Sequence, residues 1–492
     1  MQKKLKILYI SSEIAPFAKT GGLADVAGAL PKILKENEHD IRLFMPKYAS
    51  INERKFTLRE VIRLKDIIVP LGNKTAAANV KSAFLPDSKV QVYFIENKEY
   101  FNRPDFYIDP ETNKDWPDNA ERFIFFSRAA LEILKILHWQ PDIIHCNDWQ
   151  SALIPLYLKT IFKDDPFFAE THSLLSIHNI AFQGVFEPEI LPLMGVPDDL
   201  YYKESPIEFW GKINFLKGGI VYADVINTVS KNYAKEIQST DEFGRGLQFE
   251  LRKRNIDLYG IVNGIDYSVW DPEIDTLIAA NYSRRDLTGK AANKKFLVES
   301  LGLNYDENAA VIGTVSRLTD QKGFDLIAEA LDEMLKMNVQ YILLGTGDEM
   351  YHKLFEKFAQ KYPKKISVNL KFDNQLAHQI EAGCDMFLMP SQFEPCGLNQ
   401  LYSLKYGTIP IVRATGGLVD TVKKIDSDLK RGWGFVFTDY SSRAMLDEVR
   451  RAVESFKDKE NWRMLMSRAM KLDFSWRMAT EKYERLYEKL VP

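Results

Sequence analysis

Short apolar runs that alternate with longer helical patterns constrain this chain more than any other feature of its sequence. The runs are rich in Ile, Val and Leu, and polar residues rarely interrupt them. Strands with this composition are buried on both faces, as in parallel sheets that helices cover. The pattern predicts α/β layers, with strands at Lys6–Ser11, Asp142–His145, Val225–Val229, Ala310–Ser316, Gln340–Leu344, Met386–Met389 and Ile409–Val412.

The length of the chain predicts more than one such domain. Domains commonly span about 100–200 residues, and this chain has 492. The turn-rich segment Asn263–Asp266, followed by Trp270–Pro272, is the candidate hinge because Asn-Gly is a strong turn dipeptide. We therefore expect two α/β domains.

Charge, cysteines and hydropathy exclude several classes of protein. Lys and Arg number 65 and Asp and Glu 68, a net charge of −3, so the basic excess of a nucleic-acid-binding protein is absent. Cys146, Cys384 and Cys396 are too few and too scattered for a disulfide framework or a Cys-rich zinc site. The apolar run Ile7–Ile10 is shorter than a signal peptide's core of roughly 7–15 residues, and no run approaches the roughly 18 apolar residues of a membrane helix. We expect a cytoplasmic protein without nucleic-acid or membrane partners.

The heptapeptide Thr20–Val26 recurs in outline at Thr415–Thr421, and both copies begin with Thr-Gly-Gly-Leu. The first copy lies between a predicted strand and a helical pattern, where a glycine turn exposes backbone N–H groups at the positive end of a helix. With the ammonium group of Lys19 beside it, this turn is a candidate phosphate site. A tight turn that requires a positive φ explains the same glycines. Two such turns, one near each end of the chain, suit two α/β domains that share one cleft.

Two further polar segments follow predicted strands, at the sheet edge where open α/β folds bind ligands. Ser316–Gly323 holds Arg317 and Lys322, two cations suited to neutralise a departing diphosphate; a solvated basic loop is the alternative. In Ser391–Leu398, Glu394 precedes a predicted helix and could accept sugar hydroxyls or stabilise positive charge at an anomeric carbon. An exposed acid at a helix N-terminus is the simpler alternative.

The polar residues around two other predicted strand ends are less specific. His178, next to Asn179, favours either a ligand contact or an ordinary structural histidine, and Asp148 in the segment HCNDW could orient a helix or a sugar hydroxyl. No histidine spacing is typical of a metal site.

Seven motifs occur in order along nearly the whole chain, from about Lys4 to the final helical stretch: KILYISSEIAPFAKTGGLADVAGALP, SIHNIAFQG, NGIDYSVWDP, SRLTDQKGFDL, LLGTGDEMY, PSQFEPCGLNQLYSLKYGTIPIVRATGGLVDTV and DFSW. With these motifs the chain resembles the bacterial glycogen synthases and plant starch synthases. Any one motif is weak by itself, whereas seven in the same order are highly specific.

The resemblance implies a retaining glycosyltransferase of the GT-B architecture, in which two Rossmann-like domains face each other across a deep cleft. Residues 1–260 would form the N-terminal, acceptor domain, completed by a C-terminal helix (474–492) that crosses back to it. Residues 261–473 would form the nucleotide-sugar domain. The implied reaction is transfer of glucose from a sugar nucleotide, usually ADP-glucose in bacteria, to the 4-OH at a non-reducing end of an α-1,4-glucan such as glycogen. No metal or other cofactor is expected.

The resemblance also assigns roles to the motif residues. Lys19, Gly21 and Gly22 would contact the donor near its diphosphate. Arg317 and Lys322 would stabilise the leaving nucleoside diphosphate, an interaction that favours the transition state if it strengthens as negative charge develops. The transferring glucose would be held by His178 and Asn179, with Asp148 and Glu394 nearby. The donor-sugar loop would add Cys396, Gly397 and Leu398, and second-rank candidates are Asp25, Asn263, Thr415, Gly416, Gly417 and Leu418.

The chain departs from the family pattern at two positions. The family commonly has His where this chain has Asn147, and Thr where it has Asn399. Both departures concern details of sugar or nucleotide contact, because asparagine can still form hydrogen bonds. Tyr107 and Trp116, in a polar loop, are candidate contacts for the glucan acceptor, although core packing is the default role of an aromatic residue.

Several alternatives remain open at this point. A retaining hydrolase would use two carboxylates about 5–5.5 Å apart, and no paired carboxylate motif in this chain demands that mechanism. The resemblance to retaining enzymes of the GT-B architecture implies front-face displacement, in which the departing phosphate helps to deprotonate the incoming hydroxyl. Another GT-B activity, such as a sucrose-type synthase using UDP-glucose, a glucan phosphorylase or an epimerase, is a second candidate. A catalytically silent glucan-binding homologue is a third, but its expected signature is loss of Lys19, Arg317, Lys322 or Glu394, and all four are present.

Overall fold

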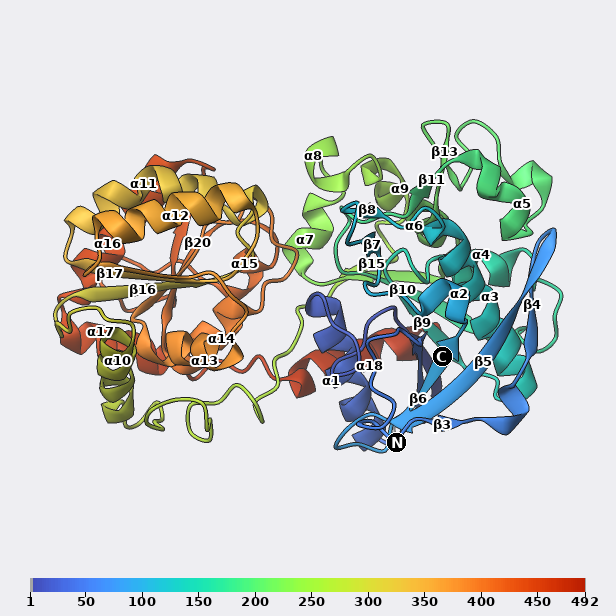
Figure 1. Ribbon diagram of the computed structural model, residues 1–492, viewed down its shortest axis with the longest axis horizontal. Coiled ribbons are helices and arrows are strands. Elements are labelled where there is room, and N and C mark those ends of the chain that lie inside the picture. Colours follow the sequence, from blue (N-terminus) through green and yellow to red (C-terminus); the bar gives the residue numbers. More distant parts are fainter. Residues whose placement is uncertain (1–2, 492) are drawn as a thin grey trace. The chain divides into compact units, whose positions relative to one another are not determined.

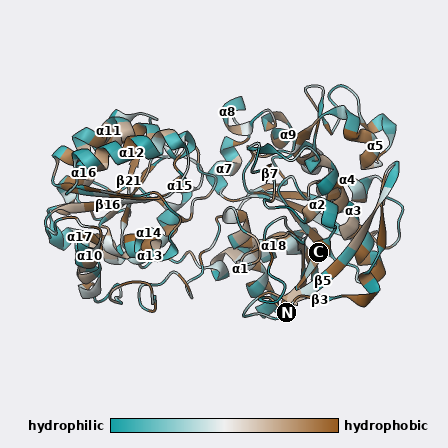
Figure 2. Ribbon diagram, in the orientation of Figure 1, coloured by the Kyte–Doolittle hydropathy of each residue, from teal (hydrophilic) through white to brown (hydrophobic). Residues whose placement is uncertain are grey.

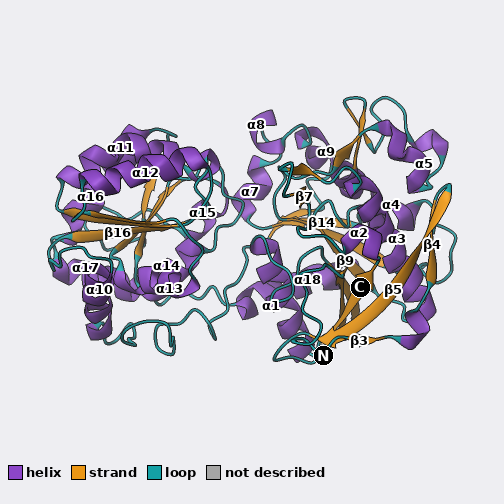
Figure 3. Cartoon of the chain, viewed as in Figure 1, coloured by secondary structure: helices purple, strands orange, loops and turns teal. Residues whose placement is uncertain are grey.

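The computed structural model describes residues 3–491, and the chain divides into two compact α/β units. The N-terminal unit comprises Met1–Val229, Ala234–Ile261 and Trp476–Pro492, and the C-terminal unit comprises Ser230–Tyr233 and Val262–Ser475. Each unit is built on a largely parallel sheet with helices packed on it (Figure 1; Figure 3). The predicted two-domain α/β fold with parallel sheets is therefore confirmed.

The large sheet of the N-terminal unit consists of β1 (Lys6–Ile10), β2 (Asp40–Pro46), β3 (Arg59–Glu60), β4 (Ile67–Leu71), β5 (Lys74–Phe84), β6 (Gln91–Glu96), β9 (Ile143–Asn147), β10 (His172–Ile177), β14 (Val225–Thr228) and β15 (Leu258–Gly260). Its strand order is β15-β14-β10-β9-β1-β2-β6-β5-β3, with β4 also paired to β5. Neighbours from β15 to β6 are parallel, whereas β5 is antiparallel to β6, β3 and β4. Residues Ile7 to Ile10 of β1 are completely buried, as expected for a parallel strand covered on both faces.

The longer helices of this unit are α1 (Gly22–Glu36), α3 (Asn119–Leu137), α4 (Leu153–Lys159), α6 (Phe215–Tyr222) and α18 (Trp476–Leu490). Short helices lie in the connections: α2 (Lys98–Phe101), α5 (Leu191–Met194), α7 (Lys231–Glu236), α8 (Asp241–Gly244) and α9 (Gln248–Lys253). Two small antiparallel sheets complete the unit, one of β7 (Ile108–Asp109) and β8 (Lys114–Asp115), the other of β11 (Val185–Phe186), β13 (Lys212–Asn214) and β12 (Glu208–Phe209).

Helix α18 reaches the N-terminal unit from the far end of the sequence and packs against α1. Asn37, which follows α1, donates a hydrogen bond to Glu484 over 2.7 Å. The imidazole of His145 in β9 is hydrogen-bonded to the hydroxyl of Tyr487 over 2.8 Å, and both side chains are fully buried. The helix thus supplies partners for buried polar groups as well as apolar surface, and the predicted return of the C-terminal helix to the first domain is confirmed.

The sheet of the C-terminal unit is entirely parallel, with the order β18-β17-β16-β19-β20-β21. Its strands are β16 (Ala310–Val315), β17 (Val339–Leu344), β18 (Ile366–Asn369), β19 (Met386–Met389), β20 (Ile409–Arg413) and β21 (Phe435–Phe437). Its helices are α10 (Thr288–Ser300), α11 (Phe324–Lys336), α12 (Glu349–Lys361), α13 (Asn374–Gly383), α14 (Asn399–Tyr406), α15 (Gly416–Thr421), α16 (Ser442–Phe456) and α17 (Lys459–Ala469).

Two apolar cores lie on the two faces of this sheet. Helices α11, α12 and α16 cover one face, and α10 and α13 cover the other (Figure 1). Successive residues of β16 alternate between them: Ala310 and Ile312 pack toward α11 and α16, and Val311 packs with α10 and α13. The strands are hydrophobic while the outer helices carry hydrophilic residues (Figure 2). Because β16, β19 and β20 are adjacent and parallel, their carboxyl ends lie side by side at one edge of the sheet.

All seven strands predicted from apolar runs occur in the structure within one or two residues of the predicted bounds. The antiparallel strands β4 and β5 were not predicted. Residues 261–287, which include the predicted hinge segment, run without a regular helix or strand (Figure 3). Within residues 3–491, no helix is long and apolar enough to cross a membrane.

Candidate active site

The loop between β1 and α1 carries Lys19 and Gly21, and Glu13 holds it in place. The buried carboxylate of Glu13 accepts hydrogen bonds from the hydroxyl of Thr20 (2.7 Å) and from its backbone N–H. Gly21 caps the N-terminus of α1 with φ −152° and ψ −168°, an extended conformation open to any residue. A Cβ atom at Gly21 would meet nothing within 4 Å. The alternative of a turn that needs a positive φ is therefore wrong for Gly21, and its backbone lies open to a ligand.

Lys19 and Asp25 form an ion pair across this loop, with 2.6 Å between Nζ and Oδ1. The lysine side chain is half exposed. Burial raises the pKa of Asp25, and the neighbouring ammonium group of Lys19 opposes that shift. In the absence of a ligand, Asp25 is thus the partner that holds Lys19 beside the exposed N-terminus of α1.

Asp148 and His178 lie at the carboxyl ends of the neighbouring strands β9 and β10. Asp148 has a left-handed backbone with φ 52°, and its carboxylate accepts hydrogen bonds from the backbone N–H groups of His178 (2.7 Å) and Asn179. Burial raises the pKa of Asp148 to about 7 despite these two donors, and burial lowers the pKa of His178 to about 4. The predicted group of Asp148, His178 and Asn179 is thus contiguous, and its imidazole is neutral at pH 7.

In the C-terminal unit, Lys322 and Glu394 form an ion pair with 2.6 Å between Nζ and Oε2. Glu394 is 6% exposed, and its carboxylate also accepts a hydrogen bond from the hydroxyl of Ser391 over 3.2 Å. The loops that carry the pair follow the adjacent strands β16 and β19 and are joined by a backbone hydrogen bond from Gln392 to Gln321. Glu394 is therefore not an exposed acid at a helix N-terminus, so that alternative is wrong.

Arg317 differs from its neighbour Lys322. Its side chain is exposed and forms no hydrogen bond or ion pair with any residue that the structure describes. The C-terminal unit thus presents one cation held against a buried carboxylate and one cation without a partner, both at the carboxyl end of β16.

The second glycine turn is locked against the loop that carries Glu394. Gly416 has φ 46°, and a Cβ atom there would lie 1.9 Å from the carbonyl oxygen of Glu394. A Cβ atom at Gly417 would lie 2.2 Å from the carbonyl oxygen of Cys396, and the N–H of Gly417 donates to the Glu394 carbonyl over 3.0 Å. Thr415 and Leu418 on either side are buried. These glycines are required by close packing, so the turn acts as the support of the Glu394 loop.

The remaining predicted residues of this unit surround the same loop. Cys396 is buried, its sulfur is hydrogen-bonded by the backbone N–H of Asn263, and burial raises the pKa of its thiol to about 12. The side-chain oxygen of Asn263 is buried without a hydrogen-bond partner among the described residues. Gly397 has φ 72°, and Leu398 is the N-cap of α14. Cys396 is thus a neutral packing group.

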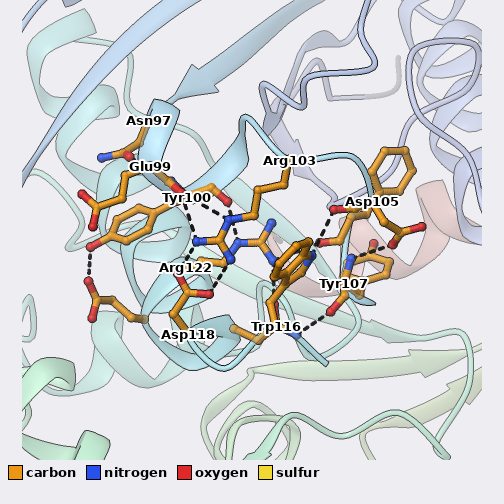
Figure 4. A network of polar contacts seen from close by, with 12 residues as sticks. Asn97, Glu99, Tyr100, Arg103, Asp105, Tyr107, Trp116, Asp118 and Arg122 are labelled. Atoms are coloured by element: carbon orange, nitrogen blue, oxygen red, sulfur yellow. Dashed lines mark hydrogen bonds and ion pairs between the residues drawn. The ribbon is translucent and has the colours of Figure 1, made fainter. Parts of the chain in front are cut away.

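Tyr107 and Trp116, the candidate acceptor contacts, belong to a loop that Arg103 organises (Figure 4). The guanidinium group of Arg103 lies 4.8 Å from the ring centroid of Trp116 and pairs with Asp118 over 2.6 Å. The Tyr107 hydroxyl is hydrogen-bonded to Glu13 over 2.9 Å. The aromatic loop is therefore connected through Glu13 to the Lys19–Gly21 loop, and contact of these aromatic residues with a glucan stays a prediction.

Sequence patterns indicated a positioning role for none of three residues that hold this machinery in place. Glu13 was missed, although an acid shortly before a glycine turn is a usable signal, and Asn147 and Asn399 were noted only as departures from the family pattern. Asn399 donates a hydrogen bond to the carbonyl oxygen of Val315 at the end of β16, over 2.5 Å. Asn147 contacts His178, a point developed below. Within residues 3–491, no group of three or more His, Cys, Asp or Glu side chains could share a metal ion.

Comparison with known proteins matches both units. Residues 6–253 match the family model of the starch synthase catalytic domain, and residues 299–464 match that of the glycosyl transferases group 1. The glycogen synthase of Thermotoga maritima is 46% identical over 491 residues, which cover 99% of each chain.

Solved structures agree with this result. The catalytic domain of starch synthase IV from Arabidopsis thaliana, bound to ADP and acarbose, is 33% identical, with a TM-score of 0.89 over 99% of this chain and 100% of that one. Sucrose-phosphate synthase from Thermosynechococcus elongatus, at 15% identity and a TM-score of 0.59 over 99% of each chain, shares the fold alone. The fold is that of the GT-B glycosyltransferases, and the resemblance stated from the motifs is confirmed. The chain therefore belongs to the family of bacterial glycogen synthases and plant starch synthases, whose members are glucosyltransferases.

Proposed function

We propose that the protein transfers glucose from ADP-glucose to the 4-OH at the non-reducing end of an α-1,4-glucan, with retention of the anomeric configuration. Family membership over the whole chain supports a nucleotide-sugar donor and a glucan acceptor. The adenine nucleotide is supported by the similarity to starch synthase IV, which was solved with ADP and acarbose. The observation that carries the assignment is the Lys322–Glu394 pair with the unpartnered Arg317 beside it.

Arg317 and Lys322 are suited to stabilise the leaving group of the reaction. Breaking the glycosidic bond to the nucleotide leaves negative charge on the diphosphate, which a preorganised cation stabilises most strongly in the transition state. Arg317 has its full set of N–H donors available and can bind phosphate oxygens in a bidentate manner. Lys322 is held in place by Glu394, so its ammonium group needs little reorganisation to act on the same charge.

The Lys19–Gly21 loop adds a second set of contacts for the donor. The open backbone of Gly21 and the N-terminus of α1 suit a phosphate group, because helix N-termini bind anions. Lys19 would exchange its contact with Asp25 for one with the diphosphate. We assign Gly22 to the same contact by its position in the motif.

The transferring glucose is assigned to Asp148, His178 and Asn179. Asp148 orders the backbone turn at residues 178 and 179, and the neutral imidazole of His178 can hydrogen-bond a sugar hydroxyl without adding charge. Among the candidate residues of the C-terminal unit, Glu394 is the one that carries a carboxylate, and its ion pair with Lys322 makes it a poor nucleophile. We therefore propose front-face displacement through an oxocarbenium-like transition state, with the departing diphosphate as the base for the incoming hydroxyl.

The test is release of nucleoside diphosphate by the purified protein from ADP-glucose and from UDP-glucose, each with and without glycogen. Release from ADP-glucose that requires glycogen is expected. Preference for UDP-glucose would overturn the donor, and no release from either donor would indicate a silent homologue. Proton NMR of the newly formed linkage checks retention, and a trapped glucosyl adduct on Glu394 or Asp148 would overturn the front-face mechanism.

We place this reaction in the cytoplasm. The support is the nature of the substrates and the cysteine usage: Cys146, Cys384 and Cys396 are all buried free thiols. Fluorescence microscopy of a tagged full-length protein in its own cells, with export to the periplasm or medium as the contradictory outcome, tests the location.

A further inference from the structure

Asn147 occupies a position where it controls the imidazole of His178. It is the last residue of β9 and completely buried, and its side-chain oxygen lies 2.9 Å from Nε2 of His178. The same oxygen accepts a hydrogen bond from the hydroxyl of Tyr9 over 3.0 Å. Asn147 is also one of the two positions at which this chain departs from the motif of its family.

The orientation of the Asn147 amide is fixed by its other contacts. Its nitrogen donates to the backbone carbonyl of Ile10 over 3.0 Å and lies 3.4 Å from that of His145. Both partners are acceptors only, so the reversed amide would point an oxygen at two carbonyl oxygens. Asn147 must therefore present its oxygen, which can only accept, to Tyr9 and His178.

This orientation decides where the imidazole carries its proton. An unprotonated Nε2 would face the amide oxygen with one lone pair against another, so Nε2 must bear the hydrogen. A neutral imidazole has one N–H group, which leaves Nδ1 of His178 as an acceptor. Within residues 3–491, that Nδ1 atom has no hydrogen-bond partner.

We propose that Asn147 is a positioning residue that fixes His178 as the Nε2–H tautomer and so makes Nδ1 an obligatory acceptor for a hydroxyl of the donor glucose. The assignment of that ligand rests on the proposed function. The tautomer itself does not, because it follows from contacts inside the N-terminal unit. A histidine at position 147, as the family commonly has, can either donate or accept, whereas asparagine held in this way can only accept. Asparagine at position 147 therefore allows a single tautomer of His178.

Two consecutive residues at the end of β9 divide the task of holding His178. Asp148 fixes the backbone of His178 through its N–H, and Asn147 fixes the ring. Because Asn147 is tied to β1 through Ile10 and Tyr9, the ring is set by the central strands of the sheet. A hydroxyl bound at Nδ1 would therefore meet an acceptor that is already in place, which reduces the cost of binding.

Two-bond 1H–15N correlation of 15N-histidine-labelled full-length protein at pH 7.5 measures this tautomer directly. His178→Gln identifies the His178 signals among those of the seven histidines. The expected result is a protonated Nε2 and an unprotonated Nδ1, whose shift changes when saturating ADP-glucose is added. A protonated Nδ1 in the unliganded protein would overturn the proposal, as would an Nδ1 signal that stays unchanged while the protein demonstrably binds ADP-glucose.

Two variants separate the role of Asn147 from general packing. Asn147→Leu removes the acceptor at similar volume, and we expect the Nδ1–H tautomer to become populated and KM for ADP-glucose to rise about tenfold. Tyr9→Phe is the matched control, since it removes the other hydrogen bond to the same oxygen and leaves the His178 tautomer unchanged. A folded Asn147→Leu variant with the wild-type tautomer would contradict the proposal, and if this variant does not fold, the wild-type spectrum still decides. Failure of the wild-type protein to bind ADP-glucose would count against the proposed function, while the unliganded spectrum still tests Asn147.

Discussion

The two Thr-Gly-Gly-Leu turns have the same sequence and different physical roles. In the N-terminal unit, Gly21 is extended and a side chain there would enter open space. In the C-terminal unit, Gly416 is left-handed and a side chain there would collide with the backbone of the Glu394 loop. The first turn leaves its backbone accessible, and the second uses its backbone to hold another loop.

The aspartates at equivalent positions of the two heptapeptides follow the same division. Asp25 pairs with the half-exposed Lys19, a contact that a ligand can displace. Asp420 accepts a hydrogen bond from the backbone N–H of Asn232 over 2.8 Å, within the C-terminal unit. A shared motif therefore identifies a shared order of strand, turn and helix, while the backbone conformation and the surroundings decide whether the turn is open to a ligand or supports another loop.

The strongest test removes the cation that pairs with Glu394, the residue whose loop the second turn supports. Lys322→Ala deletes a cation assigned to the leaving group and leaves the buried carboxylate of Glu394 unpaired, so kcat should fall by about 10²–10³-fold. Initial rates of ADP release with saturating ADP-glucose and glycogen measure the effect. Lys361→Ala, which breaks an exposed lysine–aspartate pair of similar length (2.7 Å), is the matched control and should keep the wild-type rate. Equal rates in the two variants would show that Lys322 takes no part in the reaction.

Gly416→Ala addresses the supporting turn itself. The added methyl group conflicts with the carbonyl oxygen of Glu394 at a residue with positive φ, so we expect a loss of about 2–3 kcal/mol in the free energy of unfolding. Urea denaturation of wild type and variant measures the difference. Unchanged stability would mean that the two loops are not locked together.

Gly21→Ala is the matched change in the first turn, and it should separate binding from stability. The methyl group meets no protein atom, so the free energy of unfolding should stay within about 0.5 kcal/mol of wild type. If the diphosphate approaches this backbone closely, KM for ADP-glucose should rise about tenfold, the equivalent of one hydrogen bond. A destabilised variant, or one with unchanged KM, would contradict the assignment of the first turn as an open binding turn and the second as a support.

The smallest expected effect concerns the buried acids of the two units, Glu394 and Asp148. Glu394 is paired with a cation, whereas Asp148 has only N–H donors, and burial raises the pKa of Asp148 to about 7 from an unfolded value near 3.9. Between these values the folded state binds more protons than the unfolded state, so this group's contribution to stability falls as pH rises. The free energy of unfolding of wild type minus that of Asp148→Asn should therefore decrease by about 1 kcal/mol from pH 5 to pH 6.

His178 also titrates, but it does so in the wild type and in the Asp148→Asn variant alike. To first order its contribution therefore cancels from the difference between their free energies of unfolding. Chemical denaturation at the two pH values measures the change. A difference that increases with pH would show that Asp148 is stabilised as a carboxylate in the folded protein.

Sequence patterns predicted the features that depend on neighbouring residues. The strands Met386–Met389 and Ile409–Arg413 are short runs of buried apolar residues, and their composition alone predicts them. Strand β5, with the sequence KTAAANVKSAF, was missed because alanine and lysine give no apolar run and only its pairing with β4 and β6 makes it a strand.

The candidate site shows the same difference between features set by neighbouring residues and features set by long-range contacts. The motif residues were chosen from the sequence, and the structure shows contacts between several of them within each unit, such as Asp148 with His178 and Lys322 with Glu394. Their roles toward a substrate stay predictions.

The hydrogen bonds of Glu13 with Tyr107 and of Asn147 with Tyr9 join residues that are 94 and 138 positions apart, so no local pattern predicts them. The sequence left two explanations of Gly21 open, a positive φ angle or access for a ligand, because a glycine before a helix can serve either purpose; its extended backbone excludes the first.

The return of α18 to the N-terminal unit has a consequence for the order in which a nascent chain can fold. Apart from residues 230–233, the C-terminal unit is one continuous segment, Val262–Ser475, and has all its strands once that segment has left the ribosome. The N-terminal unit is synthesised first, but its packing is complete only after α18 has been made. Tyr487 and Glu484 in α18 are the hydrogen-bond partners of His145 and Asn37. Throughout most of translation, Nδ1 of His145 therefore lacks its Tyr487 partner, and the face of α1 that packs against α18 is uncovered. In this protein the first half to be made is the last to be finished.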